Sequence, residues 1–505
     1  MKKYIDYYRD ISATDLYDGL IGYGLFAEKI PNFLTSNTFL EFTKTPDFIL
    51  NDKPKDYIRY SSMRNINIPR PMAIPEPFAY TNHIKSLTEN WSKLQDHFYK
   101  NTFNDSFKIS RIHLRKLEKK DGLFEMNYKN FSKDGVPEQE IIIKSRYVAL
   151  ADISNCFPSI YSHSISWALV GKPFAKSKKN IKTEWFNLID SYVRNLKHGE
   201  TNGILIGPHS SNLISEIILV AVDNELTKQN YKFIRNIDDY TCYAETYERA
   251  ESFFVSLSEE LKKYELALNN KKSKIISLPL ASVKKWVTKL NHFNFNNTYK
   301  VNNKEAIRVK ELKGFFDFAI ELMLNEDMDA SILNYAIKTI SNKHLDFNAK
   351  DYYIKQIHHL VLLYPYLINL LEHKVFEAHH IEKEYIKKIA QDIYEYGITK
   401  KIFEACSYAL FWSIKYDFKL DTNNNKQDSI NSMDCIFLLI SFLYDKKHFP
   451  KIYLKDYVDL SKSLKKHDFD RYWIFIYETL PWSDLPTNYK EMKKSGLTFI
   501  KPDFI

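Results

Sequence analysis

From Glu305 onward the sequence is a succession of amphipathic segments, and no other feature limits the possible folds as strongly. Apolar residues recur at three- and four-residue spacing within each segment, short polar breaks separate the segments, and strand patterns are almost absent. The first segment predicts a helix over residues 306–323. We therefore expect an all-helical C-terminal domain, packed either as a helical-repeat (HEAT-like) solenoid or as an irregular bundle.

The first half of the chain instead mixes helix and strand patterns. The apolar, β-branched run over residues 138–152 predicts a buried strand that ends at an acidic turn. Residues 231–245 predict two short strands joined at Asp238 and Asp239, and residues 211–226 have the apolar spacing of a buried helix. The chain as a whole is therefore expected to have an α+β fold.

Residues 67–80 are rich in proline. Proline fixes φ and removes a backbone donor, so this composition excludes a regular helix. We expect the segment to run extended across a surface, and the helical pattern to resume at Thr81.

Composition narrows the class of protein. The chain has 505 residues, enough for two or three domains, and its net charge of +9 suits an anionic partner without requiring one. Its four cysteines lie far apart without a CxxC pair, which argues against a zinc ribbon or a disulfide framework. No apolar run is long enough to span a bilayer. We expect a cytoplasmic protein without a membrane partner.

The acidic residues are the candidate chemical groups. Asp152 and the pair Asp238–Asp239 lie among aromatic and β-branched residues, where unpaired carboxylates would repel one another and lose hydration. An isolated acidic turn is usually a solvated turn, but buried surroundings favour divalent cations. Two Mg²⁺ ions about 3.5–4 Å apart would activate a 3′-hydroxyl and stabilise a leaving pyrophosphate. Mn²⁺ is an alternative ion.

Five segments, in order, resemble the fingers and palm of reverse transcriptases. ADISNCFPSIY resembles the first palm motif. The resemblance implies that Asp152 binds both metals, that Ile153 belongs to the metal and substrate site, and that Phe157 is a steric gate against a ribose 2′-hydroxyl. FIRNIDDY resembles the third motif, with Asp238 as a metal ligand and Asp239 beside it.

The other three segments resemble substrate-binding motifs. TNGILIGPHSSNLISEI resembles the second motif, a glycine turn and a helix beneath the incoming nucleotide. LALNNKKSKI resembles the fourth, in which Lys272 would donate a proton to the pyrophosphate, and RNINIPRPMAIP resembles the fingers segment that grips the triphosphate. The residues implied in substrate binding are Gly207, Pro208 and Ser211 of the second motif, and Arg64 and Arg70 of the fingers.

The sequence is most similar to the abortive-infection reverse transcriptases of bacterial phage defence, the AbiK-like group. The likeness lies in the Ile-Gly-Pro core at 206–208, followed by Ser211 and the Ser-Glu-Ile helix at 215–217. The resemblance implies a template-independent, protein-primed DNA polymerase that uses dNTPs, with DNA attached through a tyrosine. It also implies assembly as a homo-oligomer.

The resemblance further implies three domains, and it leaves two rival functions. Residues 1–100 would be an N-terminal and fingers segment, 101–300 the palm with fingers insertions, and 301–505 the helical domain in place of a thumb. Leu205–Ile206 stand where templated enzymes have Pro-Gln, which argues against templated synthesis more than against catalysis. The rivals are a templated RNA-directed DNA polymerase and a non-catalytic binding protein that keeps the palm as a scaffold.

Overall fold

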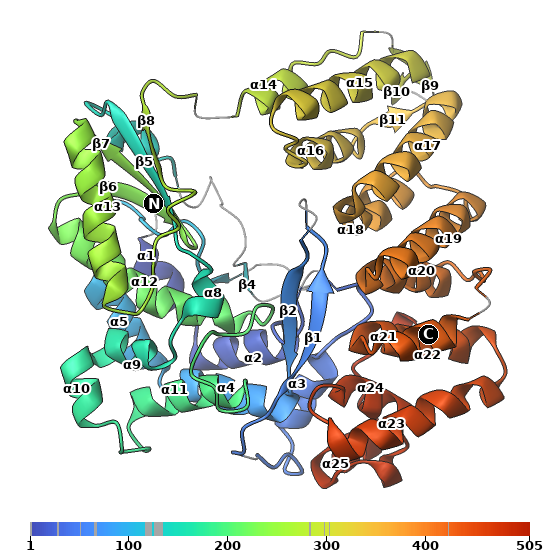
Figure 1. Cartoon of the computed structure of the whole chain (residues 1–505), viewed down its shortest axis with the longest axis horizontal. Helices are drawn as coiled ribbons and strands as arrows, with labels where there is room; N and C mark the ends of the chain where they lie inside the picture. Colours follow the sequence, from blue (N-terminus) through green and yellow to red (C-terminus); the bar gives the residue numbers. More distant parts are fainter. Residues whose placement is uncertain are drawn as a thin grey trace.

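The structure is a computed structural model with an α+β fold. It describes residues 3–27, 30–50, 52–64, 68–116, 124–125, 135–281, 284–296, 298–301, 304–422 and 424–504. The main sheet lies in the first half of the chain and the second half is dominated by helices, with the two halves side by side (Figure 1). Within the residue ranges given above, no helix is both long and apolar enough to cross a bilayer.

A sheet with the strand order β6–β7–β5–β8 forms the centre of the first half. Its strands are antiparallel, and the register pairs Asp152 with Asp239 and Asn236 with Asp239. Helix α13 (Tyr247–Lys262) packs against β5 and β7, and α12 (Ser210–Lys228) packs against α13. The strands are β5 (Tyr147–Asp152), β6 (Lys232–Asn236), β7 (Asp239–Ala244) and β8 (Lys274–Ser277).

The helix over 211–226 and the strand pair at Asp238–Asp239 are confirmed by α12, β6 and β7. Shorter helices and one two-residue strand pair surround the sheet. They are α1 (Tyr4–Arg9), α2 (Ala13–Tyr23), α3 (Asn37–Thr43), α4 (Pro77–Thr88), α5 (Trp91–Thr102), α7 (Glu138–Ile141), α8 (Cys156–Ser159), α9 (His163–Val170), α10 (Lys172–Ser177), α11 (Trp185–Asn195) and the pair β3 (Arg115–Lys116) and β4 (Phe124–Glu125).

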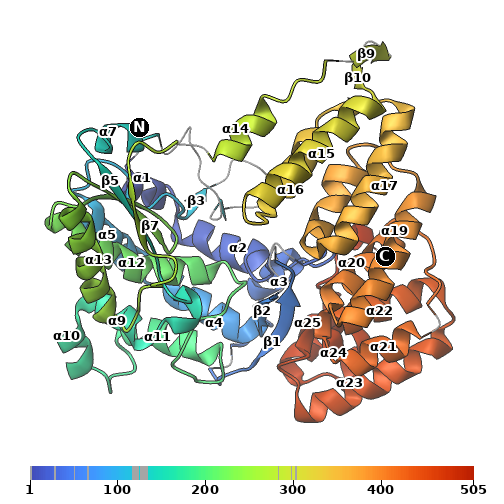
Figure 2. The ribbon, with the colours of Figure 1, turned by 45° about the horizontal axis from the view of Figure 1, so that its top comes forward.

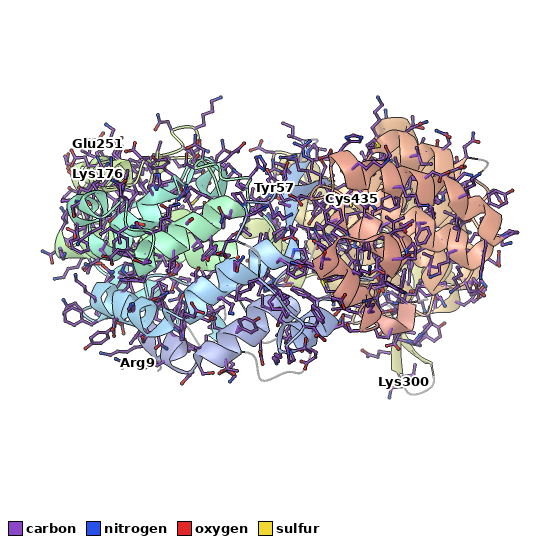
Figure 3. The ribbon with its side chains drawn as sticks, turned by 90° about the horizontal axis from the view of Figure 1, so that it is seen from below. Arg9, Tyr57, Lys176, Glu251, Lys300 and Cys435 are labelled. Carbon is purple, nitrogen blue, oxygen red and sulfur yellow. The ribbon has the colours of Figure 1, made fainter. Side chains whose placement is uncertain are left out.

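Strands β1 (Tyr57–Ser62) and β2 (Arg70–Pro75) form a separate antiparallel hairpin. Figure 2 shows this hairpin between the sheet-containing half and the C-terminal helices. In the view from below, Tyr57 of β1 again lies between the two halves (Figure 3).

The C-terminal helices form an arc in which each helix contacts near neighbours along the chain (Figure 1). A small sheet of β9 (Thr298–Val301), β10 (Lys304–Ile307) and β11 (His344–Leu345) lies at its start. The helices are α14 (Lys285–Asn291), α15 (Val309–Asn325), α16 (Ser331–Ile340), α17 (Phe347–Leu363), α18 (Ile368–Leu370), the π-helix η2 (Leu371–Phe376), α19 (Lys383–Lys400), α20 (Phe403–Lys415), α21 (Asn425–Ser432), α22 (Cys435–His448), α23 (Lys455–His467), α24 (Trp473–Thr479) and α25 (Thr487–Lys494).

The end of the arc packs back onto the first half. The backbone N–H of Thr35 donates to the carbonyl of Phe499 at 2.8 Å, and that of Lys501 donates to Phe33 at 2.9 Å. The buried carboxylate of Glu76 accepts a hydrogen bond from the Tyr489 hydroxyl at 2.8 Å. The chain therefore closes on itself through segments that are more than 400 residues apart.

Three expected elements need correction. The proline-rich segment is extended only to Pro75, because Pro77 begins α4, where its missing N–H costs nothing and the Glu76 side chain caps Ala79 at 2.7 Å. The expected strand over 138–152 is a short helix, α7, followed by β5. The side chain of Ile143 in the connection is 62% exposed, so this apolar run is not a buried strand.

The start of the helical half also differs from the expected helix over residues 306–323. Residues 304–307 form β10 and α15 begins only at Val309, because Ala306 and Ile307 pair with both β9 and β11. The expected domain boundaries at 100 and 300 fall inside α5 and β9. The three-domain division itself stays a prediction.

Candidate active site

A two-residue turn between β6 and β7 carries Asp238. Asn236 pairs with Asp239, which leaves Ile237 and Asp238 as the turn. Ile237 has a φ of +58°, a conformation that a β-branched residue rarely adopts, so the turn is strained. The backbone N–H of Ile153 donates to the Asp238 carbonyl at 3.2 Å. This contact fixes the turn beside the end of β5.

Asp152, the last residue of β5, is buried and makes polar contacts with Asn269 and Lys272. Its carboxylate accepts hydrogen bonds from the Asn269 amide at 3.1 Å and from the Lys272 ammonium at 2.8 Å. Its carbonyl accepts one from the Asn269 backbone at 2.8 Å. The Lys272 side chain is 66% exposed, so its ammonium can leave Asp152 for a ligand without breaking buried packing.

The pKa values of the Asp238 and Asp239 carboxyls are raised at this edge of the sheet. Burial, and then the charge of Asp152, raise the pKa of Asp238 above its usual value. Burial and the charges of Asp238 and Asp152 raise the pKa of Asp239 to about 6. The hydrogen bond to Asp152 raises the pKa of Lys272. Neighbouring carboxylates repel one another when both are ionised. A divalent cation bound between them would stabilise their ionised forms.

A buried ion network lies directly under the turn. The Arg235 guanidinium is fully buried and pairs with Glu216 at 3.0 Å and Asp223 at 2.7 Å, both on α12. It also donates to the carbonyl of the strained Ile237 at 2.9 Å. The Tyr240 hydroxyl donates to Asp223 at 3.0 Å. The turn that presents Asp238 is thus held from below by a buried cluster of charges.

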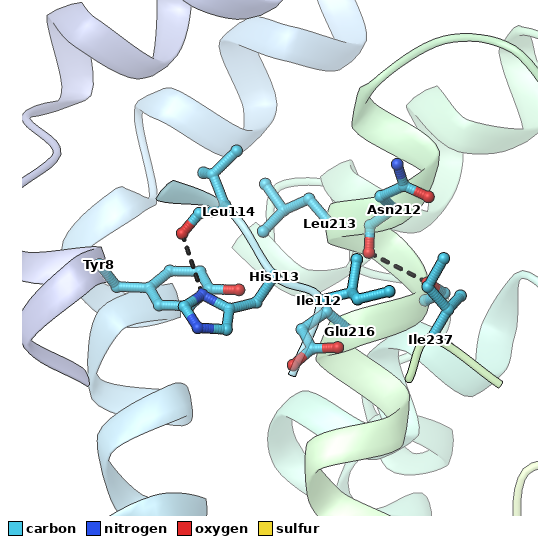
Figure 4. A pocket seen from close by; sticks show the side chains of 9 residues that line it. Tyr8, Ile112, His113, Leu114, Asn212, Leu213, Glu216 and Ile237 are labelled. Atoms are coloured by element: carbon cyan, nitrogen blue, oxygen red, sulfur yellow. Dashed lines mark hydrogen bonds between the residues drawn. The ribbon is translucent and has the colours of Figure 1, made fainter. Parts of the chain in front are cut away.

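The N-terminal helix completes this network. The Tyr4 hydroxyl donates to Glu216 at 2.7 Å, and burial followed by the charge of Glu216 raises the pKa of Tyr4 well above its usual value. Figure 4 shows Tyr8 and His113 on one side of a cavity of about 10 Å³, with Glu216 and Ile237 on the other. Such a volume admits about one water. Tyr4 and Tyr8 are therefore structural here.

The sequence motifs predicted Asp238 as a metal ligand and placed Glu216 in a helix, but they did not predict the buried pair of Arg235 with Glu216. The signal was present, because Arg235 stands inside an apolar strand pattern, where a cation needs a buried partner. The identity of that partner depended on how α12 packs and could not be read from spacing.

Phe157 lies on α8, which begins shortly after the strand that ends at Asp152, and it is half-buried. Its carbonyl accepts a hydrogen bond from the backbone of Ile204 at 2.9 Å, and that of Ile160 accepts one from Gly203 at 2.8 Å. Gly203 has a φ of +76°, and a Cβ there would lie 2.7 Å from the Pro158 carbonyl oxygen. Only glycine therefore allows this close approach, which sets the position of α8.

The turn at Gly207 joins the β1–β2 hairpin. Gly207 has a φ of +139°, and a Cβ there would lie 2.5 Å from the Ala73 carbonyl oxygen. The backbone N–H of Ala73 donates to the carbonyl of Ile206 at 2.8 Å. Pro208 and Ser211 are buried, so their side chains shape the turn and the start of α12 from inside.

The structure places the two fingers arginines differently. Arg70, the first residue of β2, is close enough to Asp238 that its charge lowers the pKa of that carboxyl, against the larger effect of burial. Arg64 lies in the connection between the strands, where its guanidinium donates to the Ile68 carbonyl at 3.2 Å. Arg70 thus faces the acidic edge, and Arg64 is bound within the connection.

Part of the chain matches a known protein family, and the matched part contains the acidic residues described above. Residues 82–308 match the family model of the reverse transcriptase (RNA-dependent DNA polymerase), so the chain contains a reverse transcriptase domain. That match includes Asp152, Asp238, Asp239 and Lys272. No curated protein matches the sequence.

Similar solved structures include telomerase from Candida tropicalis. An apo form truncated from the C-terminal domain is 13% identical with a TM-score of 0.30, and the match covers 54% of this chain and 57% of that one. The telomerase with a TWJ fragment of telomeric RNA is 12% identical with a TM-score of 0.30, covering 72% and 64%. Another apo form is 12% identical with a TM-score of 0.32, covering 82% and 75%.

Proposed function

We propose that this chain is a reverse-transcriptase-like DNA polymerase that adds dNTPs to a growing strand. The observation that carries the proposal is the pairing of Asp152 with Asp239 beside the Asp238 turn, within a reverse transcriptase domain. Asp152, Asp238, Asp239 and the backbone of Ile153 would hold two Mg²⁺ ions. When bound, such ions lower the pKa of a 3′-hydroxyl and neutralise the leaving pyrophosphate.

The chain's own residues position the substrate. Lys272 forms an ion pair with Asp152, and a bound triphosphate offers its ammonium a second anion, to which it would donate a proton. Arg70, across from Asp238, would grip the triphosphate, with Arg64 at the hairpin connection as a second cation. Phe157 would lie under the sugar and exclude a 2′-hydroxyl, while Gly207, Pro208 and Ser211 would shape the floor of the nucleotide site.

The finer assignment is to the abortive-infection reverse transcriptases of phage defence, acting in the cytoplasm as a homo-oligomer. The helical arc would serve as a HEAT-like domain in place of a thumb. Leu205 is buried and Ile206 is partly buried, so no amide side chain stands where templated enzymes place Pro-Gln. This supports synthesis without a template, begun on a tyrosine hydroxyl. Tyr4 and Tyr8 are poor candidates for that hydroxyl, because both are buried and hydrogen-bonded.

The test is incubation of the full chain with dNTPs and Mg²⁺, without primer or template. We expect a product that stays on the protein after boiling in detergent, shrinks on nuclease treatment and is absent from Asp238→Asn. Product released by detergent, or synthesis that needs a complementary template, would instead identify a templated enzyme. No product under any condition, with phage protection intact in Asp238→Asn, would refute catalysis and favour a binding protein.

A further inference from the structure

A cleft separate from the acidic edge lies among helices α9, α10 and α11. Its volume is about 750 Å³, and none of the candidate catalytic residues lines it. Figure 1 shows these helices below the main sheet, and in Figure 3 Lys176 lies toward the end of the molecule opposite Cys435. A space of this size accommodates a ligand as large as a nucleotide.

Cations dominate one wall of this cleft. Lys176, Lys179 and Lys182 line it, and residues 171–183 contain no acidic residue. Within the described residues these three lysines form no ion pair, whereas Lys172 nearby pairs with Glu265. Neighbouring ammonium groups repel one another, so an anion bound among them would be stabilised.

A histidine held by a buried carboxylate also lines the cleft. Asp190 is nearly inaccessible, and it accepts hydrogen bonds from Nδ1 of His163 at 2.5 Å and from Nε of Arg194 at 3.2 Å. These bonds fix the imidazole ring and leave Nε2, which has no hydrogen-bond partner within the described residues. A histidine ring whose orientation is fixed by a buried carboxylate is typical of a histidine that contacts a ligand.

Aromatic rings complete the lining. Tyr161, Trp167 and Tyr192 border the cleft, and the rings of Tyr161 and Trp167 meet edge to face at 5.6 Å. The Lys172 ammonium lies 3.9 Å from the centre of the Trp167 ring. Aromatic faces next to cations are the combination that binds a base together with its phosphate.

We propose that this cleft binds a nucleoside phosphate, with the lysines and the Nε2–H of a doubly protonated His163 on the phosphate oxygens and the aromatic rings beside the base. The ligand is either a free nucleotide or one unit of a single strand, since the two share this chemistry. The site does not include the acids proposed to bind metal. It can therefore be tested independently of the proposed polymerase activity.

The experiment measures binding to the full-length chain in EDTA, which removes divalent cations from the acidic edge. The probes are dATP and a short fluorescein-labelled oligodeoxythymidine, each titrated at two salt concentrations. The test variants are Lys176→Gln/Lys179→Gln/Lys182→Gln and His163→Asn, which retains a side-chain N–H for Asp190 but lacks Nε2. The matched control is Lys383→Gln/Lys388→Gln/Lys400→Gln, three exposed lysines of α19.

We expect at least one probe to bind, the triple lysine variant to lose about tenfold or more in affinity, and its salt slope to fall by about 2. His163→Asn should lose several-fold, and the α19 control should bind as the wild type does. Binding of dATP identifies a free-nucleotide site, and binding of the oligonucleotide alone identifies a strand site. The proposal is overturned if neither probe binds, if the test variants bind normally, or if the α19 control weakens equally. Asp238→Asn that binds normally but does not polymerise would separate the two sites.

Discussion

The β6–β7 hairpin carries Asp238 and Asp239, and the β1–β2 hairpin carries Arg70 near them, but the two hairpins are held in different ways. A buried cluster around Arg235, made by neighbours within the same half, holds the first. The second is held from outside, because the Glu404 carboxylate on α20 accepts hydrogen bonds from the Ser62 hydroxyl at 3.2 Å and from the Met63 backbone. Lys55, just before β1, pairs with Asp470 at 3.0 Å.

In the proposed polymerase, the carboxylates and the arginine that would bind the triphosphate are therefore held by different parts of the molecule. The acids depend on the sheet and on α12, whereas the hairpin that carries Arg70 depends on residues more than 340 positions away as well as on its bond to Ile206. Substitutions in each region should therefore change different kinetic parameters.

The largest effect is expected from the acids themselves. Asp152→Asn and Asp238→Asn each remove a metal-binding charge with little change in volume, so nucleotide addition should fall by at least about 1,000-fold. Urea unfolding should show unchanged or slightly higher stability, because repulsion between carboxylates is relieved. Wild-type rates in either variant would refute the assignment of the site.

Arg235→Met tests whether the buried cluster holds the first hairpin. Glu216 and Asp223 would be left as buried, unpaired charges, and the free energy of unfolding should fall by about 3–5 kcal/mol. Arg249→Met, at a partly exposed arginine of α13, should cost about 1 kcal/mol. Equal losses in urea denaturation would show that the cluster is not what fixes the turn.

Phe157→Ala asks whether the palm also selects the sugar. Removing the ring opens space for a 2′-hydroxyl, and the ratio of kcat/KM for deoxyribonucleotides over ribonucleotides should fall by about 100-fold. Phe103→Ala, at a ring that is 49% exposed on the surface, should leave the ratio as it is. A constant ratio in Phe157→Ala would remove the gate.

Glu404→Gln tests the external support of the second hairpin. Weakening the bonds to Ser62 and Met63 should raise KM for the nucleotide about tenfold while kcat changes little, since the acids stay in place. Glu384→Gln, an exposed residue of α19, is the matched control. A loss confined to kcat would mean that the hairpin and the acids are coupled after all.

The smallest effect concerns Asp105, whose pKa is raised to about 8 by burial and then by the charge of Asp223. The folded chain keeps a proton that an unfolded carboxyl gives up near pH 4. The stability it contributes is therefore full below about pH 4 and is lost as pH rises through 8. Tm should drop by a few degrees between pH 5 and 8, and less in Asp105→Asn. Asp96→Asn, exposed on α5, should follow the wild type.

Local pattern predicted the elements that carry the candidate site. The spacing of α12 and the alternation around Asp238 are short-range signals, and both elements form where expected. The strain at Ile237 gave no such signal, because a β-branched residue at positive φ is tolerated only through the Arg235 contact beneath it. Long-range partners were also invisible, as Tyr4 and Glu216 are 212 positions apart.

Errors in the predicted elements arose where tertiary context overrode composition. Pro77 reads as a helix breaker, but at the first position of α4 it is compatible with a helix. Ile142 and Ile143 read as a buried strand, but they lie on the surface after α7. Ala306 and Ile307 have a helix-like sequence pattern but form a strand, because they pair with His344 and Leu345. These partners lie too far along the chain to be seen in a local sequence pattern.

The pairing of residues 33–35 with 499–501 also has a consequence for how the protein is made. While the ribosome is still translating the chain, residues 33–35 have no partner, and the β1–β2 hairpin lacks its contacts with Glu404 and Asp470 until those residues emerge. Contacts of such sequence separation form late in folding. A nascent chain whose main sheet has folded would thus still lack a fixed β1–β2 hairpin. The proposed activity would therefore begin only after the C-terminal helices have been synthesised.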